Sequence, residues 1–171
     1  MADSRMVTGL FRDRDSAEGA YQSLSDRGYE RDDVNLVMSD ETRKRHFTDD
    51  GRETELGNKA AEGAGIGGAI GGTLGAIAAA VAAVGTSLVL PGLGLVIAGP
   101  LAAAIAGAGA GAAGGGLIGA LIGWGIPEER VKQYEEGIRE GGILMGVRPR
   151  NEEDAAQLQT DWRNRGEYVQ Y

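Results

Sequence analysis

The fold is decided by two stretches that repeat each other, GLFRDRDSAEGAYQSLSDRG (9–28) and GVRPRNEEDAAQLQTDWRNRG (146–166). Each contains apolar residues at helical spacing followed by a glycine, and the matching positions lie 138 residues apart: Ala17, Ala20, Leu24 and Gly28 in the first, Ala155, Leu158, Trp162 and Gly166 in the second. This spacing places apolar side chains along one face of a helix, and the glycine is a typical helix end. Both stretches therefore predict a strand followed by an amphipathic helix.

Short apolar runs on either side of these helices predict the strands. Residues 6–11 and 34–38 flank the first helix, and residues 143–148 and 167–171 flank the second. Two such βαβ halves are typical of a ferredoxin-like α+β sandwich, with four antiparallel strands and two helices on one face. Neither half has enough strands or apolar surface to be stable alone, so we predict that both pack into one domain. Asp15 and Glu18 predict a capping box for the first helix.

Charge is absent from the middle of the chain. Of the 17 basic and 25 acidic side chains, none lies in residues 63–127, which hold 20 of the 30 glycines. This distribution predicts four segments: the first βαβ half (1–39), a polar linker with His46 (40–61), an apolar helical hairpin (62–126), and an amphipathic helix from Pro127 followed by the second half (127–171). The hairpin is then an insertion between the two halves of the α+β domain.

Glycine recurs at every fourth position within two parts of the apolar block. These glycine ladders are Gly63, Gly67, Gly71 and Gly75, and then Gly107, Gly111, Gly115, Gly119 and Gly123. On a helix this spacing lets two backbones approach closely, as in membrane helix pairs. The predicted arms, 62–86 and 100–125, are each long enough to cross an apolar layer about 30 Å thick. We assign the turn between them to Pro91, Gly92, Gly94, Gly99 and Pro100.

Several classes of function are disfavoured by composition. The chain has no Cys, which excludes a disulfide scaffold, a Cys-ligated metal and a Cys nucleophile. A net charge of −8 without a basic block argues against nucleic acid. Gly63–Gly68 matches G-x-G-x-x-G, but no strand precedes it, so we expect no cofactor there. Glu128 and Glu129 fit an exposed first helical turn, and we predict no catalytic or metal-binding residues. A small-molecule ligand is left open.

Four stretches resemble the bacterial general stress proteins of the YflT and low-temperature-induced type. They are VTGLFRDRDSAEGAYQSLSDRGY (7–29), Leu90-Pro91-Gly92-Leu93-Gly94, Ala98-Gly99-Pro100-Leu101 and GIPEERVKQYEEGIREGGILMGV (125–147). The resemblance covers nearly the whole chain apart from the linker. It implies a stress-associated bacterial protein with a glycine-zipper, membrane-like segment, and it brings no catalytic residues.

These observations predict a non-enzymatic stress protein that self-associates through its hairpin, either embedded in a membrane or as a particle with the hairpins inside. The apolar stripe beside the first ladder requires cover by lipid or by another copy. The alternative is a ferredoxin-like module that senses a small molecule and is tethered to the membrane. The N-terminal residues lack an apolar stretch of signal-peptide length. We therefore expect the bacterial cytoplasmic membrane with the α+β domain in the cytoplasm, or alternatively a cytoplasmic assembly.

Overall fold

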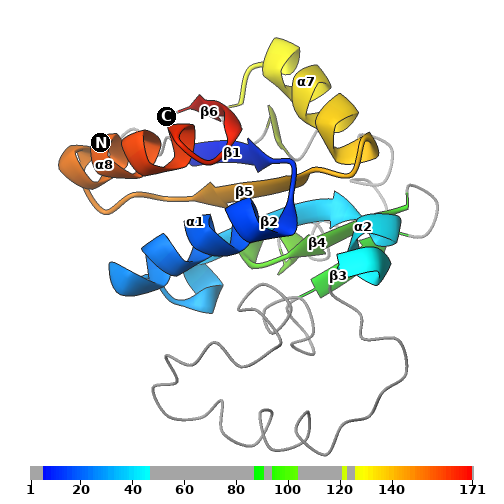
Figure 1. Ribbon diagram of the computed structural model, residues 1–171, viewed down its shortest axis with the longest axis horizontal. Helices are drawn as coiled ribbons and strands as arrows, with labels where there is room; N and C mark the ends of the chain where they lie inside the picture. The colour runs from blue at the N-terminus through cyan, green and yellow to red at the C-terminus, as the bar shows by residue number, and fades with distance from the viewer. Residues whose placement is uncertain (1–5, 47–86, 91–93, 104–120, 123–125, 171) are drawn as a thin grey trace, which may run out of the picture.

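The computed structural model describes residues 6–46, 87–90, 94–103, 121–122 and 126–170. Six strands form one antiparallel sheet in the order β3-β4-β2-β5-β1-β6 (Figure 1). The strands are β1 (Val7–Phe11), β2 (Val34–Ser39), β3 (Ser87–Leu90), β4 (Leu95–Ala98), β5 (Ile143–Val147) and β6 (Glu167–Gln170). Strand β5, from the second half, lies between β1 and β2 and pairs with both. The predicted joining of the two halves into one α+β domain is therefore confirmed.

The repeated helices begin at equivalent residues. Helix α1 (Arg14–Asp26) is capped by Asp13, whose carboxylate accepts from the Ser16 amide, and α8 (Glu152–Arg163) is capped by Asn151, whose side chain accepts from the Asp154 amide. The predicted capping box at Asp15 is wrong by two residues, because Asp13 provides the cap and Asp15 lies in the first turn. The buried positions of both helices include the residues that the repeat predicts.

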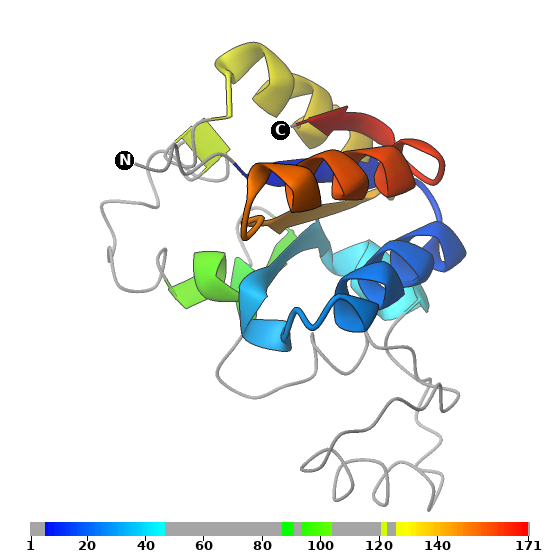
Figure 2. The ribbon, with the colours of Figure 1, turned by 90° about the vertical axis from the view of Figure 1, so that its left-hand side faces the viewer.

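Apolar side chains cover both faces of the sheet. Alternate residues of each strand point to opposite faces, so Val7 and Phe11 of β1 belong to one buried cluster and Leu10 to the other. Helices α1 and α8 pack on the first face, and α7 (Glu128–Arg139) packs on the second with Val131, Tyr134 and Ile138 (Figure 2). The start of α7 after Pro127 agrees with the sequence. The sheet is therefore the middle layer of three.

The predicted turn of the helical hairpin is wrong. Strands β3 and β4 form a β-hairpin that extends the sheet through four residue pairs between β4 and β2. The strand segments SLVL and LVIA are rich in Leu, Val and Ile, and Gly94, with a φ of +62°, provides the turn conformation that glycine adopts easily. A helix does begin at Pro100, as predicted, directly after Gly99. Pro91 and Gly92 lie outside the described residues.

The start of the predicted polar linker is also different. Residues Asp40–His46 form a short helix, α2, after β2, and a 3₁₀ turn at Arg31–Asp33 precedes that strand. Asp40 pairs with Arg43 and Lys44 across one turn, and these pairs favour the helix in a segment with little apolar material. Helix α2 packs against β2 and β4. The rest of the linker and all nine glycines of the two ladders lie outside the described residues.

Candidate functional site

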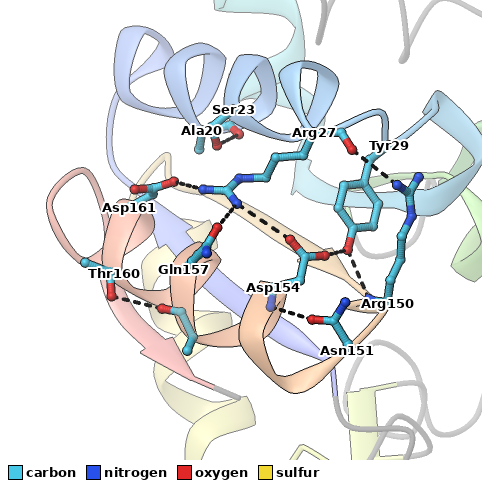
Figure 3. A network of polar contacts seen from close by, with 11 residues as sticks. Ala20, Ser23, Arg27, Tyr29, Arg150, Asn151, Asp154, Gln157, Thr160 and Asp161 are labelled. Carbon is cyan, nitrogen blue, oxygen red and sulfur yellow. Dashed lines mark hydrogen bonds and ion pairs between the residues drawn. The ribbon is translucent and has the colours of Figure 1, made fainter.

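A network of polar contacts joins the end of α1 to the start of α8 (Figure 3). The Tyr29 hydroxyl donates to Asp154, and the Arg150 amide donates to the Tyr29 hydroxyl at 3.1 Å. The Arg150 guanidinium lies over the Tyr29 ring, 4.5 Å from its centroid. These contacts bring together residues separated by more than 120 positions in the sequence. The network thus connects the two βαβ halves directly.

Two consecutive residues, Arg150 and Asn151, contact the end of α1 and the start of α8. The Arg150 guanidinium donates to the main-chain oxygens of Arg27 and Gly28, just after the end of α1. This places a positive charge at the negative end of the α1 dipole. The next residue, Asn151, caps α8. The junction is therefore a structural connection between the two helices.

Arg27 completes the network from the α1 side. Its Nη1 donates to Gln157 at 2.7 Å, its Nη2 pairs with Asp161 at 2.6 Å, and Nη1 lies 3.6 Å from Asp154. An open depression of about 460 Å³ lies beside these residues, with Glu153 and Thr160 also on its lining. Because the guanidinium nitrogens already bind protein acceptors, the depression offers a ligand little unpaired hydrogen-bonding capacity. This arrangement is typical of a cross-link between helices.

Burial and the hydrogen bond to Asp154 raise the pKa of Tyr29 to about 12. The folded protein then holds this proton above the usual tyrosine pKa of about 10, whereas the unfolded chain releases it. We expect the free energy of unfolding to fall between about pH 10 and 12, and Tyr29→Phe to remove part of that fall. At neutral pH we expect Tyr29→Phe to lower the free energy of unfolding by about 1 kcal/mol, because the hydroxyl's bonds with Asp154 and with the Arg150 amide are lost. Urea unfolding of both proteins at several alkaline pH values measures the difference. If the free energy of unfolding falls equally steeply with pH in the two proteins, Tyr29 is not the residue responsible for the alkaline loss of stability.

A second group of residues fixes the start of the second predicted arm to the sheet. Asn35 is 4% exposed; its side-chain oxygen accepts from the Leu101 amide at 2.8 Å and its nitrogen donates to the Gly146 carbonyl at 3.4 Å. Gly99 has a φ of +93°, and a Cβ there would lie 2.1 Å from the Val34 carbonyl oxygen. Only glycine allows the chain to pass so close to β2 at this position. The apolar segment that follows therefore begins at a fixed point of the domain.

The far end of that segment returns to the same cluster. Leu101, Leu121 and Ile126 are buried together with Ile97 of β4 and Tyr134 of α7. They cover the sheet face opposite α1 and α8. The α+β domain thus holds residues on both sides of positions 104–120.

Tyr134 provides the polar contacts within this apolar cluster. Its hydroxyl donates to the main-chain oxygen of Tyr168 at 2.8 Å and lies 2.9 Å from the Thr8 hydroxyl. The side chain is fully buried, and burial raises the pKa of the phenol. Tyr168 itself has a positive φ of 52° and is 43% exposed. The contact fixes α7 to both β1 and β6, so its role is structural.

Replacing Asn35 tests how firmly the segment is attached. Asn35→Ala leaves the buried Leu101 amide without its acceptor, and we expect the free energy of unfolding to fall by about 2 kcal/mol. Asn151→Ala is the matched control, because the Asn151 side chain also accepts from a main-chain amide at 2.8 Å but is exposed. We expect it to lower the free energy of unfolding by about 1 kcal/mol. Urea unfolding measures both values, and hydrogen exchange at Leu101 reports on the amide directly. Equal effects of the two variants would contradict the larger contribution that burial gives to the Asn35 hydrogen bond.

Most of the predicted site residues lie outside the described part of the chain, and their predicted role in packing and assembly stays a prediction. Gly94 belongs to a turn between strands, and Gly99 and Pro100 mark the entry to a helix. Asn35 was missed, although a polar residue inside the apolar run VNLVM is a recognisable signal. Tyr29 and Arg150 were also missed, since their contact depends on the tertiary fold.

Within the described ranges, no cluster of His, Asp or Glu has the arrangement of a metal site. Among the helices of those ranges, none has the length and hydropathy needed to cross a membrane. No protein-family model, curated protein or solved structure matches this chain. The resemblance to bacterial general stress proteins therefore stays a prediction from the quoted residues.

Proposed function

We propose that this chain is a non-enzymatic bacterial stress protein that self-associates through its glycine ladders. In this proposal a ferredoxin-like α+β domain carries the Gly/Ala-rich insertion and presents it to other copies. The strand order β2-β5-β1-β6 and the two helices on one face support the ferredoxin-like assignment. The added hairpin β3–β4 and helix α7 distinguish this domain from the simplest form of that fold.

The attachment of the insertion to the domain carries the proposal. Residues on both sides of positions 104–120 are part of the apolar core, and the Leu101 amide donates to the Asn35 side chain in the sheet. Maintaining such close contact requires Gly99 and a buried asparagine, which a simple flexible tether does not need. The domain therefore supports the insertion as a rigid base, and we infer that the insertion performs the main function.

The polar network at the α1–α8 junction gives less support to a sensing module. A sensor needs polar groups that converge on a cavity and stay available to a ligand. Arg27 and Arg150 instead bind side chains and main-chain oxygens of the domain. We therefore prefer self-association, which rests on the glycine spacing of the sequence, to ligand sensing.

Substitutions in the ladders test this function. Gly71→Leu and Gly115→Leu are expected to reduce the size of the assembly, because a branched side chain separates helices that approach through glycine. Ile70→Leu is the matched control, since it keeps both volume and hydropathy, and we expect it to assemble as the parent does. Analytical ultracentrifugation of the full chain, with detergent extraction where it sediments with membranes, measures the change. If glycine and isoleucine variants behave alike, the ladders are not the contact surface.

A further inference from the structure

We infer that a bulge at Tyr168 closes the β6 edge of the sheet to pairing with a strand of any other chain. The inference goes beyond the proposed function, because it concerns the α+β domain and does not rest on the glycine ladders. Strand β6 is the last strand in the sheet order, and among the described strands it pairs with β1 alone (Figure 1). The outer side of a regular edge strand carries main-chain groups that can bind another strand. A regular β6 would therefore be a template for strand addition.

The first observation is the interrupted pairing between β6 and β1. The register pairs on either side of the interruption are Leu10–Glu167 and Thr8–Gln170. Two residues of β6, Tyr168 and Val169, therefore lie opposite the single residue Gly9 of β1. This two-against-one arrangement is a β-bulge, which bends the strand and breaks the regular row of main-chain groups. Natural sheets use such bulges to turn an edge away from other strands.

The second observation is the backbone conformation of Tyr168. Its φ of 52° lies in the left-handed region, which is unfavourable for a residue with a large side chain. The residue is 43% exposed, so burial of the phenol does not account for this conformation. The Tyr134 hydroxyl donates to the Tyr168 carbonyl at 2.8 Å and holds it in place. Because Tyr134 belongs to α7 on one face of the sheet, this carbonyl is directed towards α7 and is withdrawn from the edge.

The third observation is a charged side chain at the start of β6. Glu167 pairs with Arg12 at 2.8 Å, and Arg12 also lies 3.4 Å from Glu140. These side chains are 47–56% exposed, so a strand added beside Glu167 would remove water from charged groups. By contrast, β3 at the other end of the sheet order contains no charged residue, and its four pairs with β4 are consecutive. Bulge and charge are therefore features of β6 in particular.

Substitutions at Tyr168 test whether the bulge closes the edge. Tyr168→Ile favours an extended backbone, because a β-branched side chain resists the left-handed conformation. Tyr168→Gly is the matched variant that adopts this conformation without cost and keeps the bulge. Gln133→Ile, on the exposed side of α7, is the control for added apolar surface. Thioflavin T fluorescence and sedimentation of the full chain are measured against protein concentration.

We expect Tyr168→Ile to bind thioflavin T and to associate at a concentration about tenfold lower than the parent, the shift that one or two added main-chain hydrogen bonds produce. Tyr168→Gly and Gln133→Ile are expected to match the parent. Glu167→Thr keeps the bulge and removes the charge, so it tests the edge separately if Tyr168→Ile fails to fold. We expect a smaller shift in the same direction from Glu167→Thr.

Two results would overturn the inference: a folded Tyr168→Ile that associates as the parent does, or a Tyr168→Gly that associates as strongly as the isoleucine variant. A Glu167→Thr that matches the parent would likewise count against a protected edge. The same variants are also made with Gly71→Leu and Gly115→Leu, and we expect the thioflavin T response of Tyr168→Ile to persist there. Ladder substitutions that leave the assembly unchanged would refute the proposed function and leave the closed edge intact.

Discussion

Gly99→Ala is expected to lower the free energy of unfolding by about 4 kcal/mol, one of the largest effects of a single added methyl group in this chain. Two costs add at this position. A φ of +93° is unfavourable for any residue with a Cβ, and the new atom would lie 2.1 Å from the carbonyl oxygen and 3.0 Å from the carbonyl carbon of Val34. Because the obstructing atoms belong to the main chain of β2, the strand itself must move. The β4–β2 pairs next to Gly99 are then weakened.

Gly94→Ala is the matched control for this prediction. Gly94 also has a positive φ, +62°, but no described atom lies within 4 Å of an added Cβ. Its expected cost is about 1 kcal/mol, from the backbone conformation alone. Urea unfolding followed by far-ultraviolet circular dichroism gives both values. Similar losses in the two variants would mean that the close approach to Val34 contributes little.

Trp162→Ala is expected to lower the free energy of unfolding by about 4 kcal/mol, since it removes the largest fully buried side chain among the described residues. Trp162 makes an edge-to-face contact with Phe11, with ring centroids 5.5 Å apart and an angle of 82°. The surrounding strands cannot close a space of this size without breaking their pairing. Calorimetry or urea unfolding measures the loss.

Trp162→Phe separates ring packing from polar contacts. The indole Nε1 is buried, with no hydrogen-bond partner among the described residues. Its removal therefore breaks no hydrogen bond of the domain, and the phenyl ring keeps part of the contact with Phe11. We expect a loss of about 1 kcal/mol, from reduced volume. A loss close to that of the alanine variant would indicate that the indole N–H has a partner after all.

The repeated pattern made the α+β core predictable. Ala17, Leu24, Leu158 and Trp162 are all buried, as their helical spacing indicates, and the two helices begin 138 residues apart. Local periodicity reports which side of a helix is buried, and a repeat reports that two segments share a structure. Neither signal requires knowledge of the tertiary fold.

Residues 87–98, which we predicted as a turn between two helices, contain strands β3 and β4, and this difference has a physical cause. Leu88–Leu90 and Leu95–Ala98 are apolar runs of four or fewer residues, and such runs fit a buried strand as well as part of a helix. Their position between two glycine-rich stretches favoured a membrane-like turn. The decisive fact is the pairing of β4 with β2, which lies about 60 residues earlier and cannot be inferred from local pattern. Tyr29, Arg27 and Arg150 were unpredictable for the same reason.

The central place of β5 also has a consequence for synthesis of the chain. Strands β1 and β2 do not pair with each other, because β5 lies between them, and about 100 residues separate Ser39 from Ile143. At typical rates of about 5–20 residues per second, a ribosome needs roughly 5–20 s to reach β5 after it has completed β2. During that interval the ribosome synthesises the uncharged stretch, residues 63–127, before β5 exists to join β1 and β2 in one sheet. The nascent chain therefore exposes this uncharged stretch before its sheet is complete, and we expect its yield to depend on chaperones or neighbouring chains that cover the stretch until translation ends.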